Sequence, residues 1–184
     1  MIYLNDDIAH FDFEKALPLL SRQRREQALK FKYELGRKTC AAAYLLLREG
    51  LRKEYGILEP PVFEYGEHGK PMLSGYPHIH FNMSHCREAV LVVVSDRPVG
   101  ADVECIREYK DSLVRYTMND AEIARIEQSD HPEVAFIRLW TMKEAKLKLS
   151  GRGITDHMKE VLDGTEDFLT VVNEKKGYIY SIIQ

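Results

Sequence analysis

Residues 78–105 read HIHFNMSHCREAVLVVVSDRPVGADVEC, and this stretch decides the fold. Its segments HIHFNMS (78–84) and AVLVVVS (89–95) are rich in β-branched and aromatic residues, which is typical of strands. The turn-forming SDRP then leads into a third strand-like segment, VGADVEC (99–105). Strand-like segments joined by short turns predict hairpins.

The patterns on either side of this stretch are helical before it and mixed after it. Gly36 is expected to separate the first two helices, and the Pro- and Gly-rich segment 59–73 predicts short extended pieces and turns. We predict four helices and a final hairpin, at residues 22–35, 37–55, 119–128, 133–149 and 168–183 respectively. Because hairpins connect the strands and no regular βαβ alternation occurs, the predicted fold class is α+β.

Composition excludes several classes of protein. A chain of 184 residues with 45% hydrophobic content can bury one sizeable core, or two small halves that share an interface. The net charge of −3 favours neither nucleic acid nor an anionic membrane as partner. Three cysteines without CxxC spacing argue against a disulfide framework, and no long apolar segment or leader pattern is present. We therefore expect a soluble cytoplasmic protein.

Asp102 and Glu104 alternate with Ala101 and Val103 in the third strand-like segment. Because successive side chains of a strand point to opposite faces, the two carboxylates share one face, about 7 Å apart. Their repulsion is relieved by a cation or by protonation of one acid. The alternative is an ordinary solvated strand face, which an isolated DVE pattern would favour.

Glu144 lies four residues after Trp140, so on a helix it shares a face with this bulky side chain. Lys148, one turn further along, is positioned to meet Glu144 in an ordinary i,i+4 pair. Together with Asp102 and Glu104, however, Glu144 completes a set of three carboxylates. Oxygen ligands of this kind suit Mg²⁺, so the three acids favour a divalent metal site.

A local positive patch lies between Arg22 and Lys38, where seven cationic residues stand against two acidic ones. Such a patch can receive a phosphate group. The alternative is a solvated helix face, which is what most charge runs are.

Two short motifs offer further groups for an anion. In EHGKP (67–71), the flanking glycine and proline restrict the backbone, so Lys70 is expected to point in a fixed direction. FNMSH (81–85) presents Ser84 and His85 at the end of a strand, where both could hydrogen-bond an anion. A single histidine is nevertheless more often structural.

Four motifs then follow one another along the chain: GKP (69–71), FNMSH (81–85), VGADVE (99–104) and WTMKEAKLK (140–148). In this order and at these separations they resemble the 4'-phosphopantetheinyl transferases of the Sfp type. The resemblance is specific over residues 69–148 and weaker in the helical region 21–55.

The resemblance implies a fold of two similar α+β halves, related by a pseudo-twofold axis, with coenzyme A in the cleft between them. The halves would be residues 1–98 and 99–184. It also implies the activity of a holo-[acyl-carrier-protein] synthase. The 4'-phosphopantetheine arm of coenzyme A would pass to a serine of an apo carrier protein, acyl, peptidyl or polyketide, and adenosine 3',5'-bisphosphate would be released.

Roles for individual residues follow from the same resemblance. The residues implied to hold Mg²⁺, or Mn²⁺ in its place, on the diphosphate are Asp102, Glu104 and Glu144. The residues implied to bind the phosphates of coenzyme A are Lys70, Ser84, His85 and, for the 3'-phosphate, Arg37. Lys148 matches the lysine that approaches the diphosphate. Glu144 would be the base for the acceptor serine, directly or through a metal-bound water.

Other readings stay open at this point. A Mg²⁺-dependent hydrolase of nucleotides or coenzyme A would also use three acids and phosphate-binding lysines, but it would need no protein acceptor. A non-catalytic docking module for an acidic partner would use the charged residues without metal. His78 and His80 could ligate zinc, although no further ligand at suitable spacing supports this. One chain could complete the cleft alone, so a monomer is expected.

Overall fold

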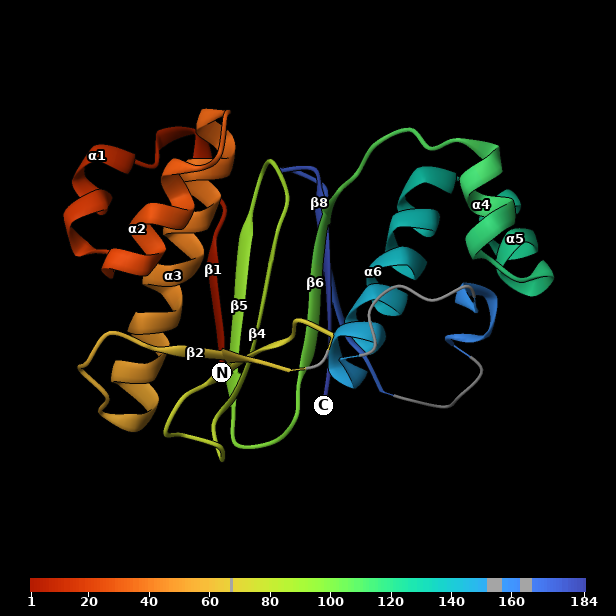
Figure 1. Ribbon diagram of the computed structural model, residues 1–184. Helices are drawn as coiled ribbons and strands as arrows, with labels where there is room; N and C mark the ends of the chain where they lie inside the picture. Colours follow the sequence, from red (N-terminus) through yellow and green to blue (C-terminus); the bar gives the residue numbers. More distant parts are fainter. Residues whose placement is uncertain (67, 152–156, 163–166) are drawn as a thin grey trace.

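The computed structural model in Figure 1 describes residues 1–66, 68–151, 157–162 and 167–184. The elements described before Asp96 are β1 (Ile2–Asn5), η1 (Ile8–His10), α1 (Phe13–Ala16), η2 (Leu17–Leu19), α2 (Arg22–Leu29), α3 (Glu34–Tyr55), β2 (Phe63–Tyr65), β3 (Pro71–Leu73), β4 (His80–His85) and β5 (Val90–Ser95). The elements described after it are β6 (Gly100–Cys105), α4 (Asp111–Thr117), α5 (Asp120–Glu127), α6 (Pro132–Ser150), η3 (Met158–Glu160), β7 (Leu169–Asn173) and β8 (Tyr178–Ile183).

Two three-stranded sheets form the middle of the molecule. Their strand orders are β1-β5-β4 and β6-β8-β7, and every pairing within them is antiparallel. Helices α1 to α3 lie on one outer side and α4 to α6 on the other, so the layers run helix, sheet, sheet, helix (Figure 1). The fold is therefore α+β, as the sequence predicted.

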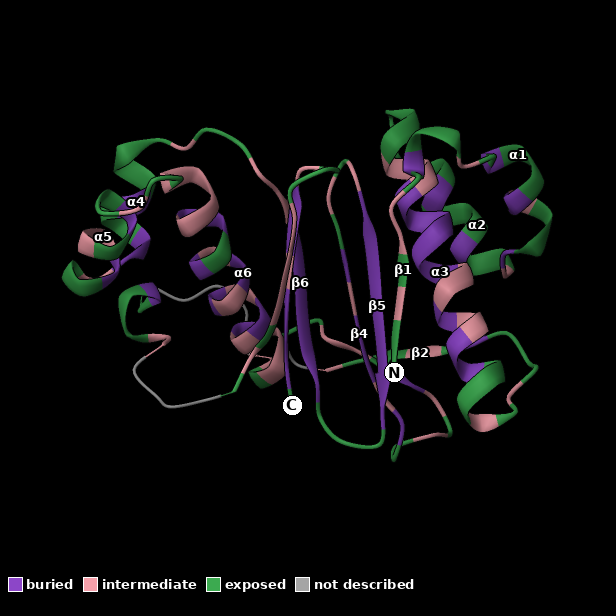
Figure 2. Ribbon diagram, turned by 180° about the vertical axis from the view of Figure 1, so that it is seen from behind, coloured by how far each residue is buried: buried purple, intermediate pink, exposed green. Residues whose placement is uncertain are grey.

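The apolar run AVLVVVS explains why two sheets can stack. Val90, Val92 and Val94 of β5 belong to the core under α3, whereas Leu91 and Val93 belong to the core between the sheets. A strand that is covered on both faces carries a continuous apolar run rather than an alternating one. Figure 2 shows β5 buried along its length, while the outer faces of the helices are exposed.

The second sheet packs against α6. The core on this side contains Phe136, Ile137 and Leu139 of α6 together with Ile179 of β8. Helix α6 ends at Ser150 and is capped by Gly151, whose positive φ of 71° permits the left-handed cap conformation. Of the helices in the described part of the chain, none is both long and apolar enough to cross a membrane.

The predicted strands at 78–105, the helix at 133–149 and the final hairpin are all present. The boundary between the first two helices was wrong, because α2 ends at Leu29 and α3 already begins at Glu34. Gly36 lies inside the first turn of α3, where a Cβ atom would overlap the Phe31 ring. The aromatic side chain folds back over the start of the helix, so this glycine allows packing and does not break the helix.

Candidate active site

Strand β6 presents both predicted acids to α6. Ala101 and Val103 belong to the core between the sheets, which leaves Asp102 and Glu104 on the opposite face, toward the helix. Asp102 is only 3% exposed. The alternative of a solvated strand face is therefore excluded for Asp102.

Gly100 sets the distance between β6 and α6. A Cβ atom at this position would overlap the carbonyl oxygen of Ala145 and would lie 2.6 Å from the backbone nitrogen of Leu149. Only a glycine lets the strand and the helix approach so closely. The acids of β6 are thereby brought next to the polar side chains of α6.

Lys148 of α6 reaches across to two other elements. Its Nζ lies 2.6 Å from Oδ1 of Asp102 and donates a hydrogen bond of 3.0 Å to Oγ of Ser84 on β4. The Ser84 hydroxyl in turn donates to Oδ1 of Asp102 at 2.7 Å. Lys148 thus pairs with Asp102, and the local i,i+4 pair with Glu144 is not what the structure shows.

The other two acids carry perturbed pKa values. Desolvation, and then the charge of Asp102, raise the pKa of Glu144 above its usual range. The same two causes raise the pKa of Glu104, although Arg107, Lys148 and a hydrogen bond from Trp140 act against them. The negative charge of Asp102 therefore raises the pKa of both acids, and the charge of Glu104 further raises the pKa of Glu144. Paired carboxylates with shifted pKa values are typical of functional sites.

Lys70 connects the loop before β3 to the end of α6. Its Nζ donates to the carbonyl oxygens of Lys148 at 2.7 Å and of Leu149 at 2.9 Å. These carbonyls lie at the helix C-terminus, where they lack partners within the helix and attract cations. Desolvation lowers the pKa of Lys70. The lysine has the fixed direction that its neighbours Gly69 and Pro71 predicted.

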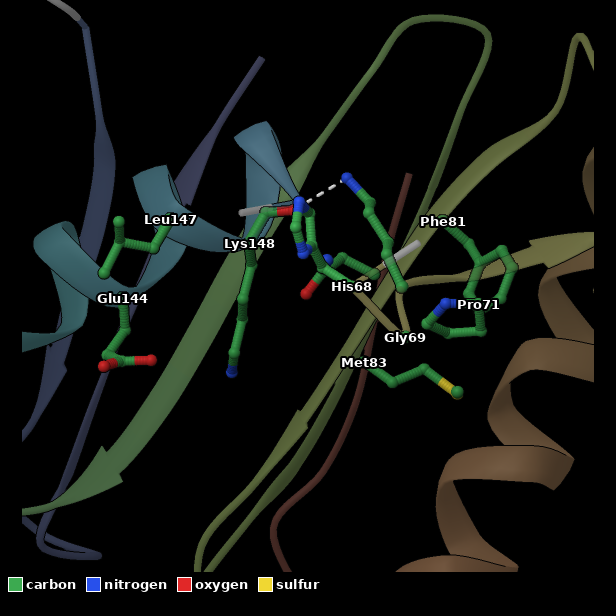
Figure 3. A pocket seen from close by; sticks show the side chains of 11 residues that line it. His68, Gly69, Pro71, Phe81, Met83, Glu144, Leu147 and Lys148 are labelled. Carbon is green, nitrogen blue, oxygen red and sulfur yellow. Dashed lines mark hydrogen bonds between the residues drawn. The ribbon is translucent and has the colours of Figure 1, made fainter. Parts of the chain in front are cut away.

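A cavity of about 290 Å³ opens between these elements. In Figure 3, Glu144, Leu147 and Lys148 extend from α6 on one side, and Phe81 and Met83 of β4 lie on the other. Lys70 also lines this cavity. One wall is therefore charged and the other is apolar, which suits a ligand with an anionic part and an uncharged arm.

His85 and Arg37 lie apart from this cavity. His85 is exposed at the end of β4, where partial desolvation and the charge of Lys148 lower the pKa of its imidazole. Arg37 lines a separate cavity of about 630 Å³ with Lys32 and Lys38, and its Nε donates to the carbonyl oxygen of Phe31. The structure thus brings Lys70, Ser84, Asp102, Glu144 and Lys148 together, but not Arg37.

The acids fit a divalent cation chemically, although they do not form a finished metal site. In the described part of the chain, no three His, Cys, Asp or Glu side chains are gathered as metal ligands. Oδ2 of Asp102 and Oε1 of Glu144 are nevertheless buried without a hydrogen-bond partner. Buried carboxylate oxygens of this kind need a proton or a cation. The residues are thus compatible with Mg²⁺.

Sequence reasoning missed one buried lysine of the WTMKEA motif. Lys143 is fully buried, its Nζ lies 2.8 Å from Oε2 of Glu122, and it donates to the carbonyl oxygen of Met158 at 2.7 Å. This pair fixes α6 against α5 beside Glu144. The position of Lys143 between Trp140 and Glu144 is visible in the motif. Its partner Glu122 is distant in sequence, so the pair could not be predicted.

Comparisons with known proteins agree with the site. The family model of the 4'-phosphopantetheinyl transferase superfamily matches residues 98–181, which include β6 and α6. The 4'-phosphopantetheinyl transferase psf-1 of Bacillus pumilus is 30% identical over 83% of this chain and 66% of its own length. The 4'-phosphopantetheinyl transferase Sfp of Bacillus subtilis (strain 168) is 24% identical over 84% of this chain and 70% of its own length.

A third relative matches a shorter part. The 4'-phosphopantetheinyl transferase AcpT of Salmonella typhi is 38% identical over 50% of this chain and 50% of its own length. The chain thus spans between half and 70% of the length of these relatives. The motif order, the matched residues and the paired acids of β6 and α6 agree, and they show that the chain is similar to the 4'-phosphopantetheinyl transferases of the Sfp type.

Proposed function

We propose that this protein transfers the 4'-phosphopantetheine group of coenzyme A to a serine hydroxyl of an apo carrier protein and releases adenosine 3',5'-bisphosphate. Similarity to this family supports the reaction type. The observation that carries the proposal is the junction of Ser84, Asp102 and Lys148 beside a cavity that Glu144 also lines. It combines acids for a metal with cations for a diphosphate.

Three cationic or polar side chains are proposed to receive the phosphates. Lys70 uses two of its three N–H donors on the end of α6, which leaves one for a phosphate oxygen. The lowered pKa of His85 keeps its imidazole neutral at pH 7, so it would act as a hydrogen-bond donor. Arg37, with Lys32 and Lys38 beside it, is proposed to bind the 3'-phosphate.

Asp102, Glu104 and Glu144 are proposed to hold Mg²⁺, with Mn²⁺ as a substitute, since hard oxygen ligands serve both ions. The buried oxygens of Asp102 and Glu144 without partners support this assignment. When bound, the ion would neutralise charge on the diphosphate during attack on phosphorus.

Two residues of α6 are proposed to act on the reacting groups. The raised pKa of Glu144 makes its carboxylate a better proton acceptor near neutral pH, so it would take the proton of the acceptor serine, directly or through a water molecule. The ammonium group of Lys148, which lines the same cavity, would stabilise the departing phosphate. Their positions on successive turns of one helix allow both groups to reach one substrate.

We also propose that residues 1–98 and 99–184 are two similar halves related by a pseudo-twofold axis. In support, each contains a three-stranded antiparallel sheet with a long helix, α3 or α6, against it. A monomer is proposed because one chain supplies both walls of the cavity. A reducing, cytoplasmic location is proposed because the three cysteines are free thiols.

Intact-mass spectrometry of an apo acyl carrier protein tests the proposal. The carrier is incubated with this protein, coenzyme A and Mg²⁺, beside a Glu144→Gln variant and an EDTA control. A gain of one phosphopantetheine group that both controls abolish is the expected result. Coenzyme A cleavage without an acceptor would indicate a hydrolase instead. Binding of the carrier that survives both controls, with neither transfer nor cleavage, would indicate a docking module.

A further inference from the structure

Two of the three cysteines lie where the edges of the two sheets meet. Cys86 directly follows β4, which is an edge strand of the first sheet, and Cys105 is the last residue of β6, an edge strand of the second. Both are free thiols and both are half-buried. The proposed reaction uses neither of them, although each directly follows a residue assigned to the site, His85 or Glu104.

The course of the strands brings the two cysteines together. Strands β4 and β5 are antiparallel, and the short segment 96–99 reverses the chain again, so β6 runs in the same direction as β4 (Figure 1). The backbone nitrogen of Val103 on β6 lies 3.3 Å from Oγ of Ser84 on β4. Two residues further along each strand, Cys105 therefore lies beside Cys86.

The side chains of the two cysteines also meet. Cys86 packs against the core between the sheets, and Tyr178, which pairs with Cys105 across β6 and β8, belongs to the same core. The thiol of Cys105 is a hydrogen-bond partner of the Cys86 thiol. Desolvation, and then this neighbour, raise the pKa of Cys86 to about 12, so its sulfur is an uncharged thiol at neutral pH. A disulfide is uncharged as well, so desolvation does not oppose its formation.

From this geometry we propose that Cys86 and Cys105 form a modification site, at which a peroxide converts the two thiols into a reversible disulfide that joins β4 to β6. One sulfur takes an oxygen atom from hydrogen peroxide, becomes a sulfenic acid and releases water. The second thiol attacks that sulfur, and the oxygen leaves as a second water molecule. Both sulfurs are oxidised and the peroxide is reduced. A small thiol reverses the bond by exchange.

The bond would move residues of the active site. The sulfur atoms of a disulfide are about 2.05 Å apart, whereas non-bonded heavy atoms in contact are about 3.5 Å apart or more. Closing this gap draws together the ends of β4 and β6, where His85 and Glu104 adjoin the cysteines. A misplacement of about 1 Å can lower a rate about 100-fold. Oxidation should therefore slow the transfer, and this consequence alone rests on the proposed function.

Mass spectrometry tests the disulfide directly. The purified protein is treated with hydrogen peroxide, remaining thiols are alkylated, and the intact protein and its tryptic peptides are weighed. The wild type should lose two hydrogen atoms and yield a peptide pair linked through Cys86 and Cys105, which dithiothreitol separates. Cys40→Ala is the matched control, because Cys40 lies in a separate core with the N-terminal helices, and it should form the same link. Cys86→Ser should form none.

The rate of carrier modification tests the consequence. It is measured for reduced protein, for oxidised protein freed of peroxide, and after treatment with dithiothreitol. In the wild type and in Cys40→Ala, kcat should fall about tenfold or more on oxidation and should recover on reduction. Cys86→Ser, which cannot form the link, should keep its rate throughout.

Three results would contradict the proposal. Folded wild type that keeps both thiols after prolonged treatment, or a disulfide between two chains instead of within one, would overturn it. An equal loss of rate in Cys86→Ser would assign the inhibition to another oxidised residue. If Cys86→Ser does not fold, Cys105→Ser takes its place with the same expectations. If reduced wild type modifies no carrier, the proposed function fails, and the linked peptides still decide whether the two cysteines pair.

Discussion

The ammonium group of Lys148 lies 2.6 Å from Oδ1 of Asp102, which joins a helix residue to a strand residue 46 positions earlier in the chain. Asp102 is almost completely buried, so this pair supplies much of the positive charge that its carboxylate requires. Lys148 thus neutralises part of the negative charge of the site, and Oδ2 of Asp102 stays without a hydrogen-bond partner.

Lys148→Met should lower the free energy of unfolding by roughly 2 kcal/mol, because a buried carboxylate loses a charged hydrogen-bond partner. Urea denaturation at pH 7 measures the change. Asp102→Asn combined with Lys148→Met should cost clearly less than the sum of the two single changes, since the pair acts as a unit. Strict additivity in this double-mutant cycle would contradict the interaction.

The raised pKa of Glu144 predicts a pH-dependent stability. A carboxyl group whose pKa is raised on folding stabilises the fold while protonated, and this contribution is lost as pH rises from its ordinary value of 4.5 through the raised pKa. Glu144→Gln stays neutral, so its stability relative to wild type should increase between pH 4.5 and pH 7. Urea denaturation over this range measures the difference.

Glu108→Gln is the control for that experiment, because Glu108 is exposed on the segment after β6. Its stability relative to wild type should stay nearly constant over the same range. If the advantage of Glu144→Gln shrank with rising pH, the direction assigned to the pKa of Glu144 would be incorrect.

Gly100→Ala should separate β6 from α6. The added Cβ would overlap the Ala145 carbonyl oxygen, and backbone atoms cannot move aside as a flexible side chain can. Overpacking of this kind should cost about 3 kcal/mol or more, measured by thermal or urea unfolding. Gly75→Ala is a useful comparison, because nothing lies within 4 Å of the added atom and only the backbone strain of a positive φ applies. Equal losses in both variants would show that close packing is not the cause.

The buried ion pair between Lys143 and Glu122 should stabilise the packing of α6 against α5. Lys143→Met leaves a carboxylate that is almost fully buried without its cation, and breaking such a pair typically costs about 3–5 kcal/mol. Circular dichroism during urea unfolding measures the loss. Lys143→Met with Glu122→Gln should recover part of it, because the uncompensated charge is then removed. No recovery would mean that packing of the lysine stem, rather than its charge, is decisive.

Much of the fold could be predicted from local patterns. The strands at 78–105 follow from their apolar runs and turns, and α6 follows from its long helical pattern. Strand β1 and helices α1 and α4 were not predicted, because segments of four to seven residues carry little periodicity. They are stabilised by neighbours distant in sequence; β1, for example, pairs with β5.

The residues of the site could be predicted better than the contacts between them. Alternation correctly placed Asp102 and Glu104 on one face of a strand. The partner of Lys148 could not be found in this way, because helix spacing offers Glu144 while the tertiary structure offers Asp102. The same holds for Lys70, whose partners are backbone carbonyls at the end of a distant helix. Residue types are visible in a sequence, but contacts between elements are not.

Strand β8 has a consequence for the synthesis of the protein. It lies between β6 and β7, so the strand that carries Asp102 and Glu104 receives its neighbour only from residues 178–183. While the ribosome is still making the segment between them, β6 has no partner on that edge. The acidic site should therefore appear late in translation, which protease protection of ribosome-bound chains halted before and after Tyr178–Ile183 would reveal.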